Sequence, residues 1–315
     1  MPQSYDPELV DSVSELQSLD LVDYRASRAK PRALAPLSDG VTVDDLTVPG
    51  RDGRSIPVRS YRPVDAGGDL PVILHFHAGG YVVGSPDGSH GRCAVLSERL
   101  GAVVLSVDYR LAPEHPFPGA LEDGVAVLQW VHRAGGSQGY DVDRVAVHGR
   151  SAGAGLAARV AIEARSTGLA LCFQYLNCPQ LDPTAVDASM MLTDTAFLGA
   201  ETVRVSWHHY LGRDGIADPQ LVARASPAHE ADLGGLPPAY VAVMQFDPLR
   251  DQGIAYASRL LASGVAVELH CFPGTFHCSS VVAPTAAVSR RELDEEIEVL
   301  RRALAPRSAT QPTSH

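Results

Sequence analysis

The sequence predicts an α/β fold, with a mostly parallel sheet of eight strands and helices on both of its faces. Eight short runs rich in β-branched and apolar residues recur along the chain, and helical patterns separate most of them. Strands that alternate with helices form parallel sheets joined by right-handed crossovers. A chain of 315 residues buries roughly three quarters of its unfolded surface, so a large core can form.

The expected strands begin with a hairpin. VTVDDLTV and SIPVRSYR are separated by PGRDG, a turn sequence typical of two antiparallel strands. The other six are apolar runs of the kind that is buried on both faces of a sheet. In chain order, the eight strands are expected at residues 41–48, 55–62, 70–77, 102–108, 144–149, 170–176, 239–244 and 265–272.

Helices are expected at 119–133, 152–167, 249–263 and 285–304, where the pattern changes between strands. Apolar residues of the N-terminal stretch also recur at helical spacing, which predicts one or two short helices within residues 1–40. The segment 184–226 interrupts the alternation and is expected to be an insertion over one end of the sheet. The last residues, 305–315, are expected to be disordered.

Composition and charge exclude several classes of function. The formal net charge of −11 repels nucleic acid and anionic membranes, and no apolar run approaches the roughly 20 residues that cross a bilayer. The acidic N-terminus lacks the pattern of a secretory signal. The five cysteines are odd in number and form no CxxC pair, which predicts neither a disulfide framework nor a structural zinc site. We therefore expect a cytoplasmic protein with no nucleic-acid partner and no stable membrane insertion.

The pentapeptide GRSAG, residues 149–153, contains the first candidate catalytic residue, Ser151. It follows the strand RVAVHG and precedes the Ala-rich helix AGAGLAARVAIEA. This setting is typical of a strained turn that exposes a serine hydroxyl at the carboxyl end of a parallel sheet. A turn of small residues that serves only packing could have the same sequence. The motif therefore indicates a nucleophile only if a base and an acid lie near the serine.

Two later residues supply those partners. Asp247 follows the strand AYVAVM, and His277 follows the strand VAVELHCF and a Pro-Gly turn. Both are therefore expected at the same sheet edge as Ser151. A serine nucleophile needs a base and an acid that orients the base, and the chain order Ser, Asp, His is that of an α/β-hydrolase.

A third requirement is a set of N–H donors for the oxyanion of a tetrahedral intermediate. The loop HAGG, residues 77–80, follows the strand at 70–77. Its paired glycines leave room for backbone N–H groups to point towards a reacting oxygen.

With these motifs the chain resembles the bacterial hormone-sensitive-lipase-like (family IV) esterases of the α/β-hydrolase superfamily, from about residue 40 to 304. HAGGYVVGS is similar to their HGGG loop, and GRSAGA is similar to their GDSAGG motif. Three further matches are DYRLAPEHPFPGALEDG, SPAHEADLGGLPPAYVAVMQFDPLRDQG and GTFH.

The resemblance implies an α/β-hydrolase domain over residues 41–304, with Ser151 as nucleophile, His277 as base and then acid, and Asp247 as the orienting acid. It also implies a helical cap, formed by residues 1–40 and an insertion at about 184–226. The oxyanion donors that it implies are the N–H groups of Gly79, Gly80 and Ala152. The pocket residues are expected to be Arg150, Tyr81 and Trp207.

The sequence departs from the family pattern at three places. Ala78 replaces the first glycine of the HGGG loop, which is not one of its donors. Cys278 and Ser279 replace a glycine and an aromatic residue after the histidine. Arg150 replaces the usual acidic residue before the serine: it could favour an anionic transition state or an acidic substrate, or it could pair with a carboxylate such as Glu114 or Glu122.

The leading hypothesis is a serine carboxylesterase that hydrolyses short- to medium-chain esters through an acyl-enzyme, with no metal and no organic cofactor. Its partner is a small-molecule ester, and the family suggests a homodimer. The alternatives are a ligand-binding protein on a hydrolase scaffold, against which the presence of His277 counts, and amidase or lipase activity on the same residues.

Overall fold

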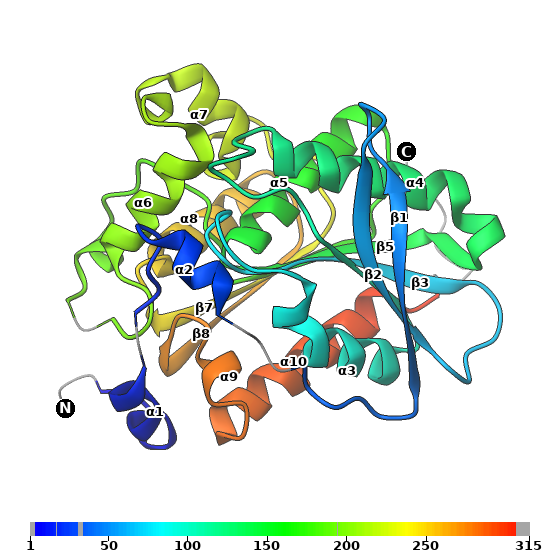
Figure 1. The fold of residues 1–315 in the computed structure, drawn as a ribbon, viewed down its shortest axis with the longest axis horizontal. Coiled ribbons are helices and arrows are strands. Elements are labelled where there is room, and N and C mark those ends of the chain that lie inside the picture. The colour runs from blue at the N-terminus through cyan, green and yellow to red at the C-terminus, as the bar shows by residue number, and fades with distance from the viewer. Residues whose placement is uncertain (1–3, 17, 31–33, 194, 307–315) are drawn as a thin grey trace.

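One sheet of eight strands runs through the molecule, in the order β1-β2-β4-β3-β5-β6-β7-β8 (Figure 1). The computed structural model describes residues 4–16, 18–30, 34–193 and 195–306. β1 and β2 form the predicted antiparallel hairpin, β2 also pairs antiparallel with β4, and the other neighbouring strands are parallel. The strands are β1 (Val41–Pro49), β2 (Ser55–Pro63), β3 (Leu70–Phe76), β4 (Val103–Val107), β5 (Tyr140–Arg150), β6 (Phe173–Asn177), β7 (Ala239–Phe246) and β8 (Val267–Phe276).

The predicted fold class and all eight expected strands are confirmed. β5 begins four residues before the expected position and β8 ends four residues after it. After the buried Tyr140, the early residues of β5 are mostly charged and are not fully buried, so apolar patterning does not mark them.

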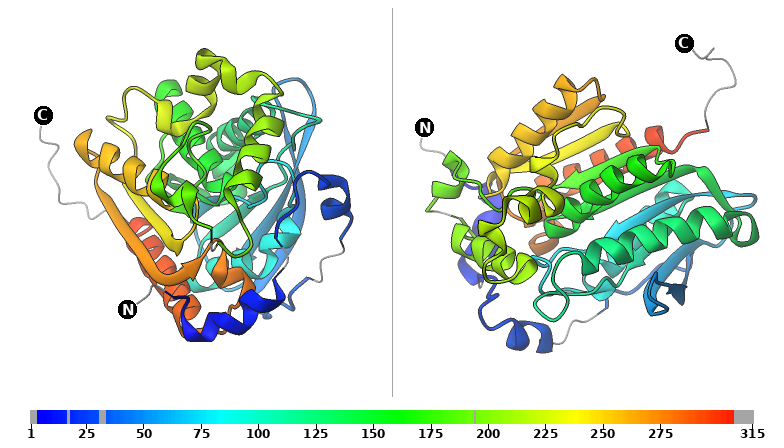
Figure 2. Two further views of the ribbon diagram at one scale, coloured as in Figure 1. Left: turned by 90° about the vertical axis from the view of Figure 1, so that its left-hand side faces the viewer. Right: turned by 90° about the horizontal axis from the view of Figure 1, so that it is seen from above.

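Helices cover both faces of the sheet, as the two views of Figure 2 show. One face carries α4 (Gly119–Gln138), α5 (Ala152–Thr167) and α8 (Arg250–Ala262), all predicted. The other face carries α3 (His90–Leu100) and α10 (Ala287–Ala303). Of these, α3 was not predicted, because its sequence HGRCAVLSERL mixes glycine, cysteine and arginine into a weak apolar pattern.

The remaining helices lie mainly beyond the carboxyl ends of the parallel strands (Figure 1). Leu19 N–H donates to the Phe197 carbonyl at 2.8 Å, so the N-terminal segment packs against the 184–226 segment. The helices are α1 (Val10–Glu15), α2 (Tyr24–Ala29), α6 (Ala200–Leu211), α7 (Pro219–Ala225) and α9 (Ser279–Val282), with 3-10 turns η1 (Pro7–Leu9), η2 (Pro86–Ser89), η3 (Ala188–Met191), η4 (Gly215–Ala217) and η5 (Pro227–His229).

Most of the expected disordered tail at 305–315 lies outside the described residues, which end at residue 306. Within the described residues, no helix combines the length and the apolar character that crossing a bilayer requires.

Candidate active site

Ser151 lies in a sharp turn between β5 and α5. Its backbone φ of 57° and ψ of −125° are rarely adopted by a residue with a side chain. A Cβ on Gly149 would collide with the carbonyl group of Gly153, so the tight turn requires glycine there. The Ser151 N–H donates to the Asn177 carbonyl at 2.8 Å, which fixes the turn on the neighbouring strand β6.

The structure brings Ser151, His277 and Asp247 together, from three separate strand ends. The carboxylate Oδ2 of Asp247 lies 2.7 Å from His277 Nδ1, and His277 Nε2 lies 2.8 Å from Ser151 Oγ. Since a carboxylate only accepts, Nδ1 carries the proton, and Nε2 of the neutral ring accepts from the serine hydroxyl. All three side chains are buried.

The environment of His277 raises its pKa. Burial by itself lowers the pKa of an imidazole, but the charge and hydrogen bond of Asp247 act together with the neighbouring Cys278 thiol to outweigh burial, and they raise the pKa of His277 to about 10. Asp247 is held in turn by the Leu249 N–H, which donates to Oδ1 at 2.8 Å. The carboxylate thus orients the ring and stabilises the imidazolium that a proton transfer would create.

The HAGG loop and the start of α5 lie beside Ser151 and His277. Gly79 has a φ of 141°, and a Cβ there would collide with the Val83 carbonyl oxygen. Among the described residues, the N–H groups of Gly79 and Gly80 donate to no backbone acceptor. Ala152 is the first residue of α5, where an N–H has no partner within the helix. These are the three predicted donors, and a bound oxyanion could accept from them.

A cavity of about 430 Å³ opens beside Ser151 and His277. Apolar side chains from distant segments line much of it, among them Leu19, Val95, Phe197 and Leu293. Its volume lies in the range of small-molecule sites. The cavity also has a polar part, lined by arginine and histidine side chains of β3, β5 and α3.

Comparison with known proteins agrees with this geometry. A model of the alpha/beta hydrolase fold matches residues 73–280. The chain belongs to this family. The chain is similar to the carboxylic ester hydrolase LipN of Mycobacterium tuberculosis, with 41% identity over 81% of this chain and 70% of LipN. It is also 36% identical to the carboxylesterase NlhH of the same organism, over 85% of this chain and 86% of NlhH.

The solved structures lead to the same family. The structure of a bacterial heroin esterase superposes with a TM-score of 0.92 and 42% identity, over 96% of this chain and 99% of that one. The predicted membership in the hormone-sensitive-lipase-like esterases is therefore confirmed, and with it the predicted enzyme class, carboxylic ester hydrolase.

Of the three residues predicted for the pocket of this α/β-hydrolase, Arg150 lines the cavity. Tyr81 and Trp207 are not among the residues that line it. Instead, Tyr81 stacks on Tyr210 with 3.9 Å between ring centroids, and Trp207 packs beside both. Both side chains are fully buried, and their contacts with Tyr210 pack the loop that follows β3 against α6.

Arg150 is paired with a carboxylate, but not with either carboxylate named as an example from the sequence. Its Nη2 lies 3.2 Å from Glu292 Oε1 on α10, and its Nη1 donates to Ser280 Oγ at 2.8 Å. Glu114 and Glu122 pair instead with Arg28 and Arg110. Arg92 of α3 contacts the same Glu292 and also Glu296. The positive charges of the two arginines therefore offset the negative charges of the two glutamates in this cluster.

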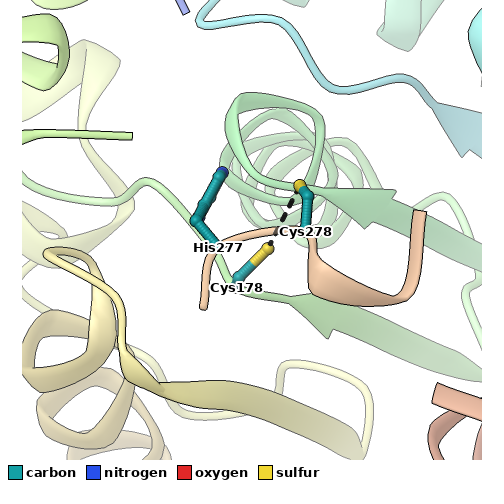
Figure 3. Close-up of side chains that lie close together, drawn as sticks. All are labelled: Cys178, His277 and Cys278. Atoms are coloured by element: carbon teal, nitrogen blue, oxygen red, sulfur yellow. Dashed lines mark hydrogen bonds between the residues drawn. The ribbon is translucent and has the colours of Figure 1, made fainter. Parts of the chain in front are cut away.

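Two thiols flank His277 (Figure 3). Cys178 Sγ lies 3.9 Å from Cys278 Sγ, and a ligand atom of His277 lies within 4.8 Å of both sulfur atoms. These three residues could hold a thiophilic metal ion. Both ring nitrogens of His277 are already hydrogen-bonded, so such an ion would displace Asp247 or Ser151.

Sequence reasoning missed several polar residues of this site, namely His75, Arg92, His148, Glu292 and Glu296. One signal was available. His75 and His148 each follow an apolar stretch within their strands, VIL in β3 and VAV in β5, and a polar residue on a strand that is buried on both faces needs a partner.

Proposed function

We propose that this chain is a serine carboxylesterase that cleaves short- to medium-chain esters through an acyl-enzyme on Ser151. The observation that carries the proposal is the pair of hydrogen bonds from Asp247 through His277 to Ser151, beside a cavity of small-molecule size. A serine hydroxyl alone is a weak nucleophile, and it becomes reactive when a neighbouring imidazole takes its proton.

In the first half of the reaction, Ser151 Oγ attacks the ester carbonyl while its proton passes to His277 Nε2. The carbonyl oxygen becomes an oxyanion, which accepts hydrogen bonds from the N–H groups of Gly79, Gly80 and Ala152. Asp247 stabilises the imidazolium. His277 then donates the proton to the leaving alkoxide, and the acyl group remains on Ser151.

In the second half, water replaces the alcohol. His277 takes a proton from the water, the hydroxide attacks the acyl-enzyme, and the same N–H groups stabilise the charge. The proton returns from His277 to Ser151 Oγ as the carboxylic acid leaves. The cycle restores the starting state and uses only this chain's own groups and water.

We also propose that residues 1–40 and 184–226 form a cap over residues 41–304, the catalytic domain. Leu19 and Phe197 come from these two segments, line the cavity and share a backbone hydrogen bond. A cavity of about 430 Å³ with several apolar walls favours esters of short to medium chain length.

A panel of p-nitrophenyl esters from acetate to palmitate, with a p-nitroanilide beside it, tests the proposal. We expect hydrolysis of the short and medium esters, little of palmitate or the anilide, and a loss of about 10³-fold or more in kcat in Ser151→Ala. Ester hydrolysis at the wild-type rate in Ser151→Ala would overturn the mechanism. Binding without cleavage would favour a ligand-binding protein.

A further inference from the structure

Two buried thiols lie next to each other beside His277 (Figure 3). Cys178 Sγ and Cys278 Sγ are 3.9 Å apart, the distance of a weak hydrogen bond between two sulfur atoms. The two cysteines are 100 residues apart in the sequence, and the fold brings them together at the carboxyl edge of the sheet. The proposed ester hydrolysis uses neither thiol, so the pair can carry a chemistry of its own.

Cys278 is the thiol that a small molecule can reach. It lines the cavity beside Ser151, whereas Cys178 is not among the residues that line this cavity. The exposed fraction is 5% for Cys278 and 1% for Cys178. A small oxidant that enters the cavity therefore meets Cys278 first, and the second thiol lies within 3.9 Å of the sulfur atom that it meets.

The surroundings of Cys278 favour its reactive form, since the thiolate is the nucleophile in thiol chemistry. The hydrogen bond from the Cys178 thiol lowers the pKa of Cys278 well below its usual value, and His277 and Arg150 act in the same direction against burial. Burial raises the pKa of Cys178 instead, with the neighbouring Cys278 acting in the same direction. The accessible thiol is thus also the more nucleophilic one.

Each cysteine adjoins a residue that positions the catalytic groups. Cys278 directly follows His277. Cys178 directly follows Asn177, whose carbonyl accepts the hydrogen bond from the Ser151 N–H at 2.8 Å. A bond between the two sulfur atoms would therefore pull on both sides of the hydrogen bond between His277 and Ser151.

The size of that pull is sufficient to disturb catalysis. The sulfur atoms of a disulfide lie about 2.05 Å apart, so oxidation draws these two together by roughly 2 Å. A displacement of about 1 Å at a catalytic group can cost about 10²-fold in rate. Half of the movement, passed on to His277 or to the Asn177 carbonyl, is thus enough to suppress hydrolysis.

We propose that Cys178 and Cys278 are a redox-sensitive dithiol, which a hydroperoxide oxidises to a disulfide, and that this disulfide reversibly suppresses ester hydrolysis. The suppression rests on the proposed esterase function, whereas formation of the disulfide does not. The two cysteines are therefore a modification site beside the active site.

The oxidation takes two steps. The Cys278 sulfur attacks one oxygen of the hydroperoxide, the O–O bond breaks, and the other oxygen leaves as water or an alcohol with the proton of this thiol. The Cys178 sulfur then attacks the sulfenic acid on Cys278: the S–S bond forms, the S–O bond breaks, and the hydroxyl leaves as water with the proton of Cys178. Two electrons pass from the thiols to the peroxide, and an added thiol reverses the reaction by exchange.

The wild-type protein provides the first test. It is treated with hydrogen peroxide in the presence of a metal chelator, the remaining thiols are alkylated, and the protein is digested with chymotrypsin without reduction. Cleavage after Tyr175 and Phe276 separates each cysteine of the pair from its nearest cysteine in the sequence. We expect a peptide that links Cys178 to Cys278, with a loss of about tenfold or more in kcat on p-nitrophenyl butyrate, and dithiothreitol should reverse both.

Two variants connect the reversible loss to this pair, each compared with its own untreated sample. Cys178→Ala removes the second thiol, so peroxide should drive Cys278 beyond the sulfenic acid to the sulfinic acid, and dithiothreitol should no longer restore the activity. Cys271→Ala is the matched control, because Cys271 is an exposed cysteine on β8. This control should show the same linked peptide and the same recovery as the wild type.

The outcomes separate the dithiol from the esterase function. Absence of the linked peptide, a linked peptide with unchanged hydrolysis, or full recovery in Cys178→Ala would overturn the dithiol and leave the esterase function intact. Absence of ester hydrolysis in the untreated wild type would overturn the proposed function, and the suppression with it. The measurements on the wild type need no variant to fold.

Discussion

Arg150 and Glu292 form a buried ion pair, with 3.2 Å between Nη2 and Oε1, at the residue directly before Ser151. The pair joins β5, the strand that ends directly before the nucleophile, to helix α10 on one face of the sheet. Burial lowers the pKa of an arginine in general, but the charge of Glu292, together with Glu296 and two neighbouring thiol groups, outweighs burial here and raises the pKa of Arg150, so the guanidinium stays charged. The arginine is thus bound to the scaffold and serves it as a structural cation.

Arg150→Met should destabilise the fold. Removal of one partner leaves Glu292 buried, although Arg92, Asn177 and Ser280 still contact it, so we expect a loss of about 3 kcal/mol in the free energy of unfolding. Urea denaturation measures it. The control is Arg301→Met, which breaks an exposed pair with Glu298 and should cost less than about 1 kcal/mol. Equal losses in the two variants would contradict the structural role of Arg150.

Ester hydrolysis should rise with pH through an apparent pKa above 6.5, because His277 must be neutral to act as base and Asp247 raises its pKa. Asp247→Asn should move this midpoint to lower pH and reduce kcat by about 10²–10⁴-fold. The pH profile of kcat/KM in both proteins measures the shift. An unchanged midpoint in Asp247→Asn would show that the carboxylate does not act on His277.

The interaction between Asp247 and His277 also contributes to the free energy of unfolding, and its contribution depends on pH. The folded protein raises the pKa of His277, so the folded state gains from the protonated ring. This contribution is complete below the unfolded pKa near 6.5 and is lost as pH rises towards 10. Unfolding free energies of the wild type and Asp247→Asn should therefore converge at alkaline pH.

Gly79→Ala should remove most of the activity. The added Cβ collides with the Val83 carbonyl oxygen, so the loop must shift and its N–H donors leave their positions, with an expected loss of about 10²-fold or more in kcat. Gly53→Ala is the matched control, because Gly53 also has a positive φ but its Cβ meets nothing within 4 Å. Equal kcat values in the two variants would contradict the donor role of the loop.

Local sequence patterns predicted most of the fold. Each buried strand is an apolar run with β-branched residues, and GRSAG lies between a strand and an Ala-rich helix, so these patterns alone were enough to place Ser151 at a strand end. The parallel sheet then placed Asp247 and His277 at the same edge. Helix α3 was missed, because the burial that stabilises it comes from the sheet and from α10 rather than from its own pattern.

The polar cluster could not be predicted in the same way, because its partners are distant in the sequence. Arg150 and Glu292 are 142 residues apart, and the His75 and His148 rings meet only because β3 lies beside β5. Strand order and helix packing decide these contacts, and local sequence patterns reveal neither of them. The contacts of Tyr81 and Trp207 with Tyr210 could not be predicted for the same reason, since they depend on how α6 packs.

The central claim is that Ser151 is the residue that becomes acylated. A fluorophosphonate probe followed by peptide mass spectrometry tests it directly, with Ser151→Ala as the control. We predict one probe per chain on the peptide that contains Ser151, with ester hydrolysis lost in proportion to labelling. Labelling at another residue, or full ester hydrolysis in a protein whose Ser151 is blocked, would contradict the account.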